Sequence, residues 1–128
     1  MNIPADLKYT QGDEWIRVEG DEGVIGISDY AQDHLSDIVY VELPEVGRGV
    51  KAGESLGTIE SVKAAADINT PVSGAVSAVN ESLPDSPELV NQDPYGQAWM
   101  VRLKLSDPKE LDNLMDAAAY QKYCEERG

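Results

Sequence analysis

The chain has 128 residues, of which 41% are hydrophobic and 27% charged, a length and composition typical of one globular domain. Its 24 acidic and 10 basic residues give a net charge of −14, which excludes nucleic acid as a partner because a phosphate backbone repels such a chain. No apolar run approaches the length of a membrane span, and the single cysteine, Cys124, excludes an internal disulfide. The lone histidine, His34, has no cysteine pair beside it, so we expect no metal site.

The N-terminal third predicts a β-hairpin followed by a short helix. Residues 14–18 alternate in hydrophobicity, residues 19–23 form a turn, and residues 24–27 return as the partner strand. Ser28 or Asp29 then caps a helix, because either side chain can accept a hydrogen bond from an N–H group of the first turn.

A second group of strands is marked by glycine, proline and β-branched residues. Residues 38–43 form a strand that Pro44 ends, and two further strand segments, 53–60 and 67–76, flank Lys63. Residues 74–79 follow, with Gly74 ahead of a strand. The lysine therefore lies at the apex of a predicted hairpin, where its amine points into water. Such a position is poor for a core residue and suits a group that a second enzyme must reach.

The C-terminal part predicts a long loop, one more strand and two helices. Residues 80–97 contain three prolines and form the loop, with one helical turn in it. Residues 99–105 alternate, which indicates a strand with one buried face and Met100 on the other face. Asp107, followed by a proline, begins a helix, and residues 117–125 form the last one.

The chemistry of Lys63 favours acylation over catalysis. A free lysine amine has a pKa near 10.4. The nearby carboxylates of Glu60 and Asp67 keep the amine protonated, which disfavours a role as a base or in a Schiff base. An amide on this amine would carry a group such as biotin or lipoate. The alternative is an ordinary exposed lysine in a turn.

Short motifs stand in a fixed order along nearly the whole chain, from about Leu7 to Glu125. They are Tyr9-Thr10, Glu14-Trp15, Gly26-Ile27-Ser28-Asp29-Tyr30-Ala31-Gln32, Asp37-Ile38-Val39, Val41-Glu42-Leu43-Pro44, Glu60-Ser61-Val62-Lys63-Ala64, Pro71-Val72-Ser73-Gly74, Leu89-Val90-Asn91 and Asp93-Pro94-Tyr95-Gly96 with Trp99. Together they resemble the H proteins of the glycine cleavage system. Biotin carriers place methionines on both sides of the lysine, and lipoyl domains of 2-oxoacid dehydrogenases place an aspartate before it, whereas this chain has Val62 and Ala64.

The resemblance implies a mainly β fold with short helices, the barrel-sandwich hybrid of the lipoyl/biotinyl type, with a lysine at a hairpin tip and helices at the C-terminus. It implies a single lipoyl-carrier domain over residues 1–128. The core would span about residues 7–105, and the C-terminal helical segment about residues 107–125.

The resemblance also implies a non-catalytic carrier with lipoate in amide linkage on Lys63. Such a carrier takes the aminomethyl group of glycine from a pyridoxal-phosphate-dependent decarboxylase to an aminomethyltransferase, and dihydrolipoamide dehydrogenase then reoxidises it. Lipoate-attaching enzymes would be further partners, and we expect a monomer.

A cleft for the loaded arm is a further implication. Glu14 and Asp67 match the acidic residues of the family that would hold the aminomethyl cation by charge-assisted hydrogen bonds. Glu60 would help to present the lysine. Two departures from the family pattern affect the polar contacts of this cleft, namely Asp13 in place of a histidine and Gly12 in place of the serine of some members.

Three alternatives remain at this point. An H-like protein could instead relay lipoyl groups or bind lipoate for sulfur oxidation. A true enzyme is disfavoured, because no nucleophile–base pair is visible. A structural adaptor would leave Lys63 unmodified. The N-terminal segment has neither a basic amphipathic pattern nor an apolar signal core, so we expect a bacterial cytoplasmic protein rather than a processed mitochondrial matrix form.

Overall fold

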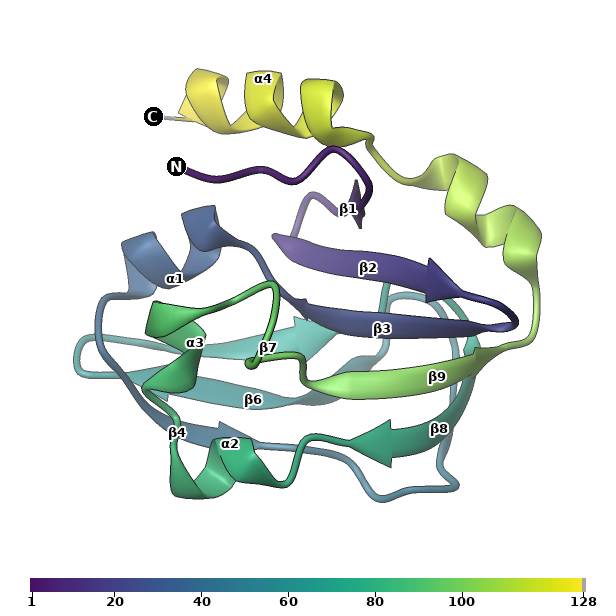
Figure 1. Cartoon of the computed structure of the whole chain (residues 1–128), viewed down its shortest axis with the longest axis horizontal. Coiled ribbons are helices and arrows are strands. Elements are labelled where there is room, and N and C mark those ends of the chain that lie inside the picture. The colour runs from purple at the N-terminus through teal and green to yellow at the C-terminus, as the bar shows by residue number, and fades with distance from the viewer. Residues whose placement is uncertain (128) are drawn as a thin grey trace.

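The computed structural model describes residues 1–127 and contains two antiparallel β-sheets with short helices around them (Figure 1). One sheet has six strands in the order β1-β2-β3-β9-β8-β5, and the other has three in the order β4-β6-β7. The strands are β1 (Lys8–Tyr9), β2 (Glu14–Glu19), β3 (Glu22–Ile27), β4 (Ile38–Glu42), β5 (Gly49–Val50), β6 (Ser55–Ser61), β7 (Ala65–Asn69), β8 (Gly74–Val79) and β9 (Val101–Leu105). The helices are α1 (Asp29–Leu35), α2 (Ser82–Asp85), α3 (Leu89–Gln92), the 3-10 helix η1 (Pro108–Asn113) and α4 (Ala117–Arg127). The predicted mainly β class with short helices is confirmed.

The two sheets share one hydrophobic core. Ile25 and Leu103 of the six-stranded sheet belong to the same buried cluster as Val41, Ile59 and Ile68 of the three-stranded sheet, and each of the five is at most 1% exposed. Burying a side chain of this kind stabilises the fold by roughly 1.5–3 kcal/mol. Because successive side chains of a strand point to opposite faces, the residues between these core positions point outward.

The predicted hairpin and helix of the N-terminal third are present. Strands β2 and β3 pair from Glu14–Ile27 to Glu19–Glu22, and Gly20 takes a positive φ of 65° in the turn between them. The Ser28 hydroxyl accepts the Ala31 N–H at 3.2 Å, so Ser28 rather than Asp29 caps α1.

The predicted strand segment over residues 67–76 covers parts of two strands in different sheets, and the predicted segment over residues 74–79 is the second of them. Strand β7 ends at Asn69, and β8 begins at Gly74 on the other side of the core. The corner is held by Thr70, whose N–H donates to the Glu54 carbonyl and whose carbonyl accepts from the Gly53 N–H, both at 2.8 Å. These bonds pair the corner that precedes β6 with the corner that follows β7, so the base of the lysine hairpin is fixed.

Two predictions for the C-terminal part need correction. The loop over residues 80–97 contains two four-residue helices, α2 and α3, where the sequence predicts one helical turn. Met100 is fully buried in the main core, while Trp99 packs against a second cluster, so both faces of the chain are covered there. The regular strand β9 begins only at Val101.

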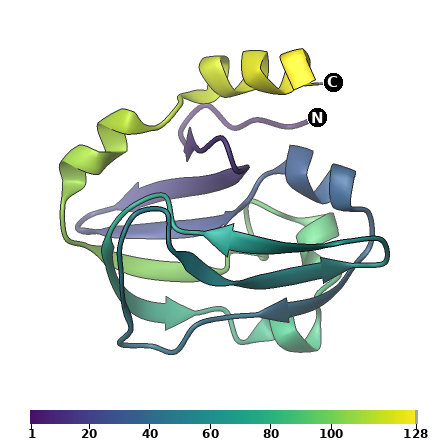
Figure 2. The ribbon, with the colours of Figure 1, turned by 180° about the vertical axis from the view of Figure 1, so that it is seen from behind.

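The second cluster attaches the C-terminal segment to the N-terminal strands. Asp107 caps η1 by accepting the Lys109 N–H at 3.2 Å, but this predicted helix is a 3-10 helix. Figure 2 shows α4 lying alongside the N-terminal segment. There the rings of Tyr9 and Tyr120 stack with centroids 4.5 Å apart, and Tyr120 and Cys124 are buried.

Candidate functional site

Lys63 lies in the exposed turn that joins β6 and β7. The hydroxyl of Ser61 accepts the N–H groups of Lys63 at 3.2 Å and Ala64 at 3.0 Å, and the Ser61 N–H donates to the Ala64 carbonyl at 2.7 Å. Val62, which lies between Ser61 and Lys63, is 65% exposed. Within residues 1–127, no carboxylate lies within ion-pair distance of the Lys63 amine. The backbone of the turn is therefore held while the amine stays accessible.

A second contact ties this turn to the neighbouring strand. The Val62 N–H donates to the Asp37 carbonyl at 3.0 Å, directly before β4. Residue-type patterns did not identify Ser61 or Asp37 as site residues. A serine two positions before the lysine is the usable signal, since serine hydroxyls commonly hold turns in this way. The Asp37 contact is made by the backbone and carries no sequence signal.

Glu60 and Asp67 lie on the outward face of the three-stranded sheet. Glu60 pairs with Ala65 and Asp67 with Thr58, on positions that alternate with the buried Ile59. Both carboxylates are exposed. Glu60 is adjacent to Ser61 but makes no side-chain hydrogen bond to the turn. The structure thus brings these two predicted residues onto one face beside the lysine turn.

Glu14 occupies a different environment, because it is only 3% exposed. Its Oε1 accepts the Thr10 hydroxyl at 2.5 Å, and its Oε2 accepts the backbone N–H of Asn69 at 3.2 Å. Burial raises the pKa of Glu14 above its ordinary value, and the hydrogen bonds from Thr10 and Asn69 offset part of that rise. The Thr10 hydroxyl also accepts the backbone N–H of Glu14, so Thr10 holds both the backbone and the carboxylate of this residue. Sequence patterns did not identify Thr10 as a site residue.

Asn69 connects Glu14 to the lysine hairpin. It is the last residue of β7, the outer strand of its sheet, and its N–H points at Glu14. Asn69 is six positions after Lys63, and β7 spans about 13 Å of extended chain between its first and last Cα atoms. Asp67 lies between them. A long acyl arm on Lys63 that folds back along β7 would therefore pass Asp67 before it reaches Glu14.

Gly12 lies against the Glu14 carboxylate. A Cβ added at Gly12 would lie 2.9 Å from Glu14 Oε1 and 3.2 Å from Oε2. Gly12 itself is exposed. A side chain at this position would therefore crowd the carboxylate.

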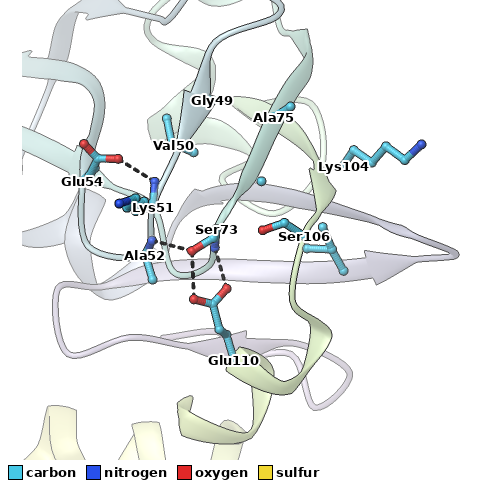
Figure 3. A pocket seen from close by; sticks show the side chains of 12 residues that line it. Gly49, Val50, Lys51, Ala52, Glu54, Ser73, Ala75, Lys104, Ser106 and Glu110 are labelled. Carbon is cyan, nitrogen blue, oxygen red and sulfur yellow. Dashed lines mark hydrogen bonds between the residues drawn. The ribbon is translucent and has the colours of Figure 1, made fainter.

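A groove of about 950 Å³ lies past the other end of the hairpin (Figure 3). Lys51, Ser73, Lys104 and Glu110 are among the residues that line it. Figure 3 shows the Glu110 carboxylate turned toward Ser73, whose N–H and hydroxyl both donate to it at 2.8 Å. None of the predicted site residues lines this groove, so it is separate from the site around Lys63.

Two further observations concern the part of the chain that the structure describes. Within it, no group of three His, Cys, Asp or Glu side chains is placed to bind a metal ion. None of its helices combines the length and the apolar character needed to cross a membrane.

Comparison with known proteins agrees with this geometry. The sequence matches the family described as "Glycine cleavage H-protein" over residues 7–127. The glycine cleavage system H protein of Symbiobacterium thermophilum is 58% identical, with 98% of each chain covered, and that of Thermus thermophilus is 55% identical, also with 98% of each covered. The mitochondrial H protein 2 of Arabidopsis thaliana is 54% identical over 97% of this chain and 80% of its own length.

The crystal structure of a glycine cleavage system H protein from Mycobacterium marinum has the same fold. It superimposes with a TM-score of 0.86 at 36% identity, covering 98% of this chain and 99% of that one. This likeness confirms the predicted barrel-sandwich hybrid. The family match and the full-length relatives together show that the chain belongs to the glycine cleavage H-protein family, the non-catalytic lipoyl carriers of the glycine cleavage system.

Proposed function

We propose that Lys63 is the residue that bears the lipoyl group of this carrier. The single observation that carries the proposal is an exposed lysine amine at the tip of the β6–β7 hairpin, on a turn whose backbone Ser61 holds. Lipoate in amide linkage would supply a dithiolane whose sulfur accepts the aminomethyl group. An attaching enzyme reaches the amine without disturbing the core, because the packed residues of the hairpin point the other way.

The partners follow from the family. The carrier serves the glycine decarboxylase, the aminomethyltransferase and dihydrolipoamide dehydrogenase of the glycine cleavage system. A tethered arm suits three successive active sites, because tethering raises the local concentration of the reactive group wherever the carrier docks. We infer that lipoate-attaching enzymes are further partners and that Glu60 helps to present the lysine to them.

Glu14 and Asp67 are the residues that we assign to the loaded arm. An aminomethyl group is cationic near neutral pH, and a carboxylate stabilises it by a charge-assisted hydrogen bond. Glu14 suits this role because its buried carboxylate has no cationic partner within residues 1–127 and lies against the exposed Gly12. Exposed Asp67 meets the arm on its way along β7.

We also propose that the protein works as a monomeric single domain in the bacterial cytoplasm. Most of the relatives named above are bacterial proteins, although one is named as mitochondrial. The packing of α4 on β1 supports one domain, because the C-terminal segment shares a buried cluster with the N-terminal strands.

A lysine-to-arginine pair tests the attachment site. Lys63→Arg keeps the charge but removes the acylatable amine, so we expect no lipoylation by a lipoate-attaching enzyme and no glycine cleavage in a reconstituted system. Lys51→Arg, at another exposed turn, serves as the control and is expected to behave as the parent protein. A Lys63→Arg protein that is still lipoylated and active would overturn the assignment.

A further inference from the structure

The C-terminal helix α4 contacts the loop that leads into β2 through a dense set of polar bonds on Asp13. The Arg127 guanidinium donates to Oδ2 at 3.2 Å and to Oδ1 at 2.5 Å, and the Tyr120 hydroxyl donates to Oδ1 at 2.8 Å. The Asp13 carbonyl accepts the Ser28 N–H at 2.9 Å. Asp13 is thus fixed both by α4 and by the residue that caps α1.

Asp13 has an unfavourable backbone conformation. Its φ is +75°, and it is one of two non-glycine residues with a positive φ within residues 1–127. A left-handed conformation costs a non-glycine residue on the order of 1 kcal/mol or more, and it persists only where the surrounding contacts hold it. In this protein, the side chains of Arg127 and Tyr120 and the backbone N–H of Ser28 hold Asp13 in this conformation.

The position of Arg127 is itself well determined. Its guanidinium lies 4.2 Å from the ring centroid of Tyr30 and 4.0 Å from that of Tyr123, and its side chain is 29% exposed. Aromatic rings on both sides orient the guanidinium and shield it from water, which strengthens its bond to Asp13. The pair is therefore more than a loose surface ion pair.

The backbone conformation of Asp13 determines the position and direction of Glu14, the first residue of β2. Glu14 follows Asp13 directly, and its carboxylate must reach both the Thr10 hydroxyl and the Asn69 N–H. We propose that Arg127, together with Tyr120, acts through Asp13 as a positioning residue that holds the Glu14 carboxylate beside β7. The inference rests on the proposed role of Glu14 in binding the aminomethyl group.

The first test uses the unlipoylated protein and does not depend on that role. Arg127→Gln removes the ion pair, and Arg102→Gln is the matched control, because Arg102 also bridges carboxylates, Glu19 and Glu22, with a side chain 32% exposed. Hydrogen exchange of the Asn69 amide is measured relative to the neighbouring Thr70 amide, which is bonded to Glu54 instead. We expect a relative acceleration of about fivefold in Arg127→Gln, as for one weakened hydrogen bond, and none in Arg102→Gln.

The second test uses the lipoylated protein loaded with the aminomethyl group. The lifetime of the loaded form is expected to fall about fivefold in Arg127→Gln, to recover in part in Arg127→Lys, and to stay unchanged in Arg102→Gln. An unchanged Asn69-to-Thr70 exchange ratio in Arg127→Gln would overturn the positioning role. A changed ratio with an unaltered lifetime in both Arg127→Gln and Glu14→Gln would instead overturn the proposed role of Glu14.

Discussion

The Glu14 carboxylate accepts the backbone N–H of Asn69 at 3.2 Å, and this bond joins the first long strand of one sheet to the end of the lysine hairpin in the other. Asn69 lies on the outer strand of its sheet, so its N–H would otherwise face away from any strand partner. The buried Glu14 carboxylate therefore contacts one end of β7, and the other end of β7 leads back to the exposed turn that contains Lys63.

The lifetime of the loaded arm tests the role of Glu14. Glu14→Gln removes the negative charge and keeps the size, so we expect normal lipoylation and at least about tenfold faster breakdown of the aminomethyl-loaded form, as for the loss of a hydrogen bond to a charged group. The measurement is the decay of the loaded form by intact mass. Glu81→Gln, at an exposed residue whose side chain makes no capping bond, is the control and is expected to leave the lifetime unchanged. Equal lifetimes for all three proteins would refute the assignment of Glu14.

Stability against pH reports on the same carboxylate without any cofactor. Burial raises the pKa of Glu14 in the folded state, so the folded protein binds this proton more readily than the unfolded chain does. The destabilising effect of the ionised form is complete above the folded pKa and is relieved as the pH falls through it toward the unfolded value of about 4.3.

The free energy of unfolding in urea, measured from pH 7 to pH 4.5, checks this sign. The difference between the parent and Glu14→Gln should shift in favour of the parent as the pH falls, while the difference between the parent and Glu81→Gln should stay flat. A difference that shifts the other way would show that Glu14 is not a carboxyl with a raised pKa.

Strands β4 and β6 approach each other so closely at Gly57 that we expect only glycine to fit there without strain. A Cβ added at Gly57 would lie 2.0 Å from the Glu42 carbonyl oxygen, so backbone would have to move. We expect Gly57→Ala to lower the free energy of unfolding by about 2 kcal/mol or more, the range of severe packing changes. A Cβ added at Gly49 has no atom within 4 Å, so Gly49→Ala should change the free energy of unfolding by less than about 0.5 kcal/mol. Equal stabilities of the two variants in urea would contradict the register of this sheet.

The lysine turn supplies a prediction about recognition. Ser61→Ala removes the hydroxyl that accepts the Lys63 and Ala64 N–H groups, so the turn is held less firmly, by its backbone bonds alone. We expect slower lipoylation at saturating lipoate, with a loss of only about 1 kcal/mol in stability because the turn is exposed. The comparison is Ser77→Ala, whose hydroxyl donates to the Arg102 carbonyl elsewhere on the surface. Equal lipoylation rates for the two variants would mean that the turn shape is not recognised.

Local patterns predicted the elements of this fold where one face of an element is buried. The β2–β3 hairpin, the Ser28 cap and the Asp107 cap could be predicted because each depends on neighbours in sequence. The change of sheet after Asn69 could not, since Pro71 and Gly74 mark a turn but no local pattern says which sheet the next strand joins. Met100 was assigned to a solvent-exposed face, because an alternating strand is expected to have one. Protein covers both faces of the chain there, so Met100 is buried.

The site shows the same division. Lys63 at an exposed hairpin tip was predictable from composition and spacing, and Asp67 and Glu60 lie beside it as neighbours in the hairpin. The burial of Glu14 and its bonds to Thr10 and Asn69 depend on the meeting of two sheets, which no local pattern encodes. The contacts of Asp13 with Arg127 join residues 114 positions apart, so no local sequence pattern could predict them either.

The most direct test of the central claim is peptide mapping by mass spectrometry of protein purified from its native host with lipoate available. We expect the added mass of one lipoyl group on the peptide that contains Lys63. A chain in which Lys63 is unmodified, or in which the lipoyl group is attached to another lysine, would contradict it.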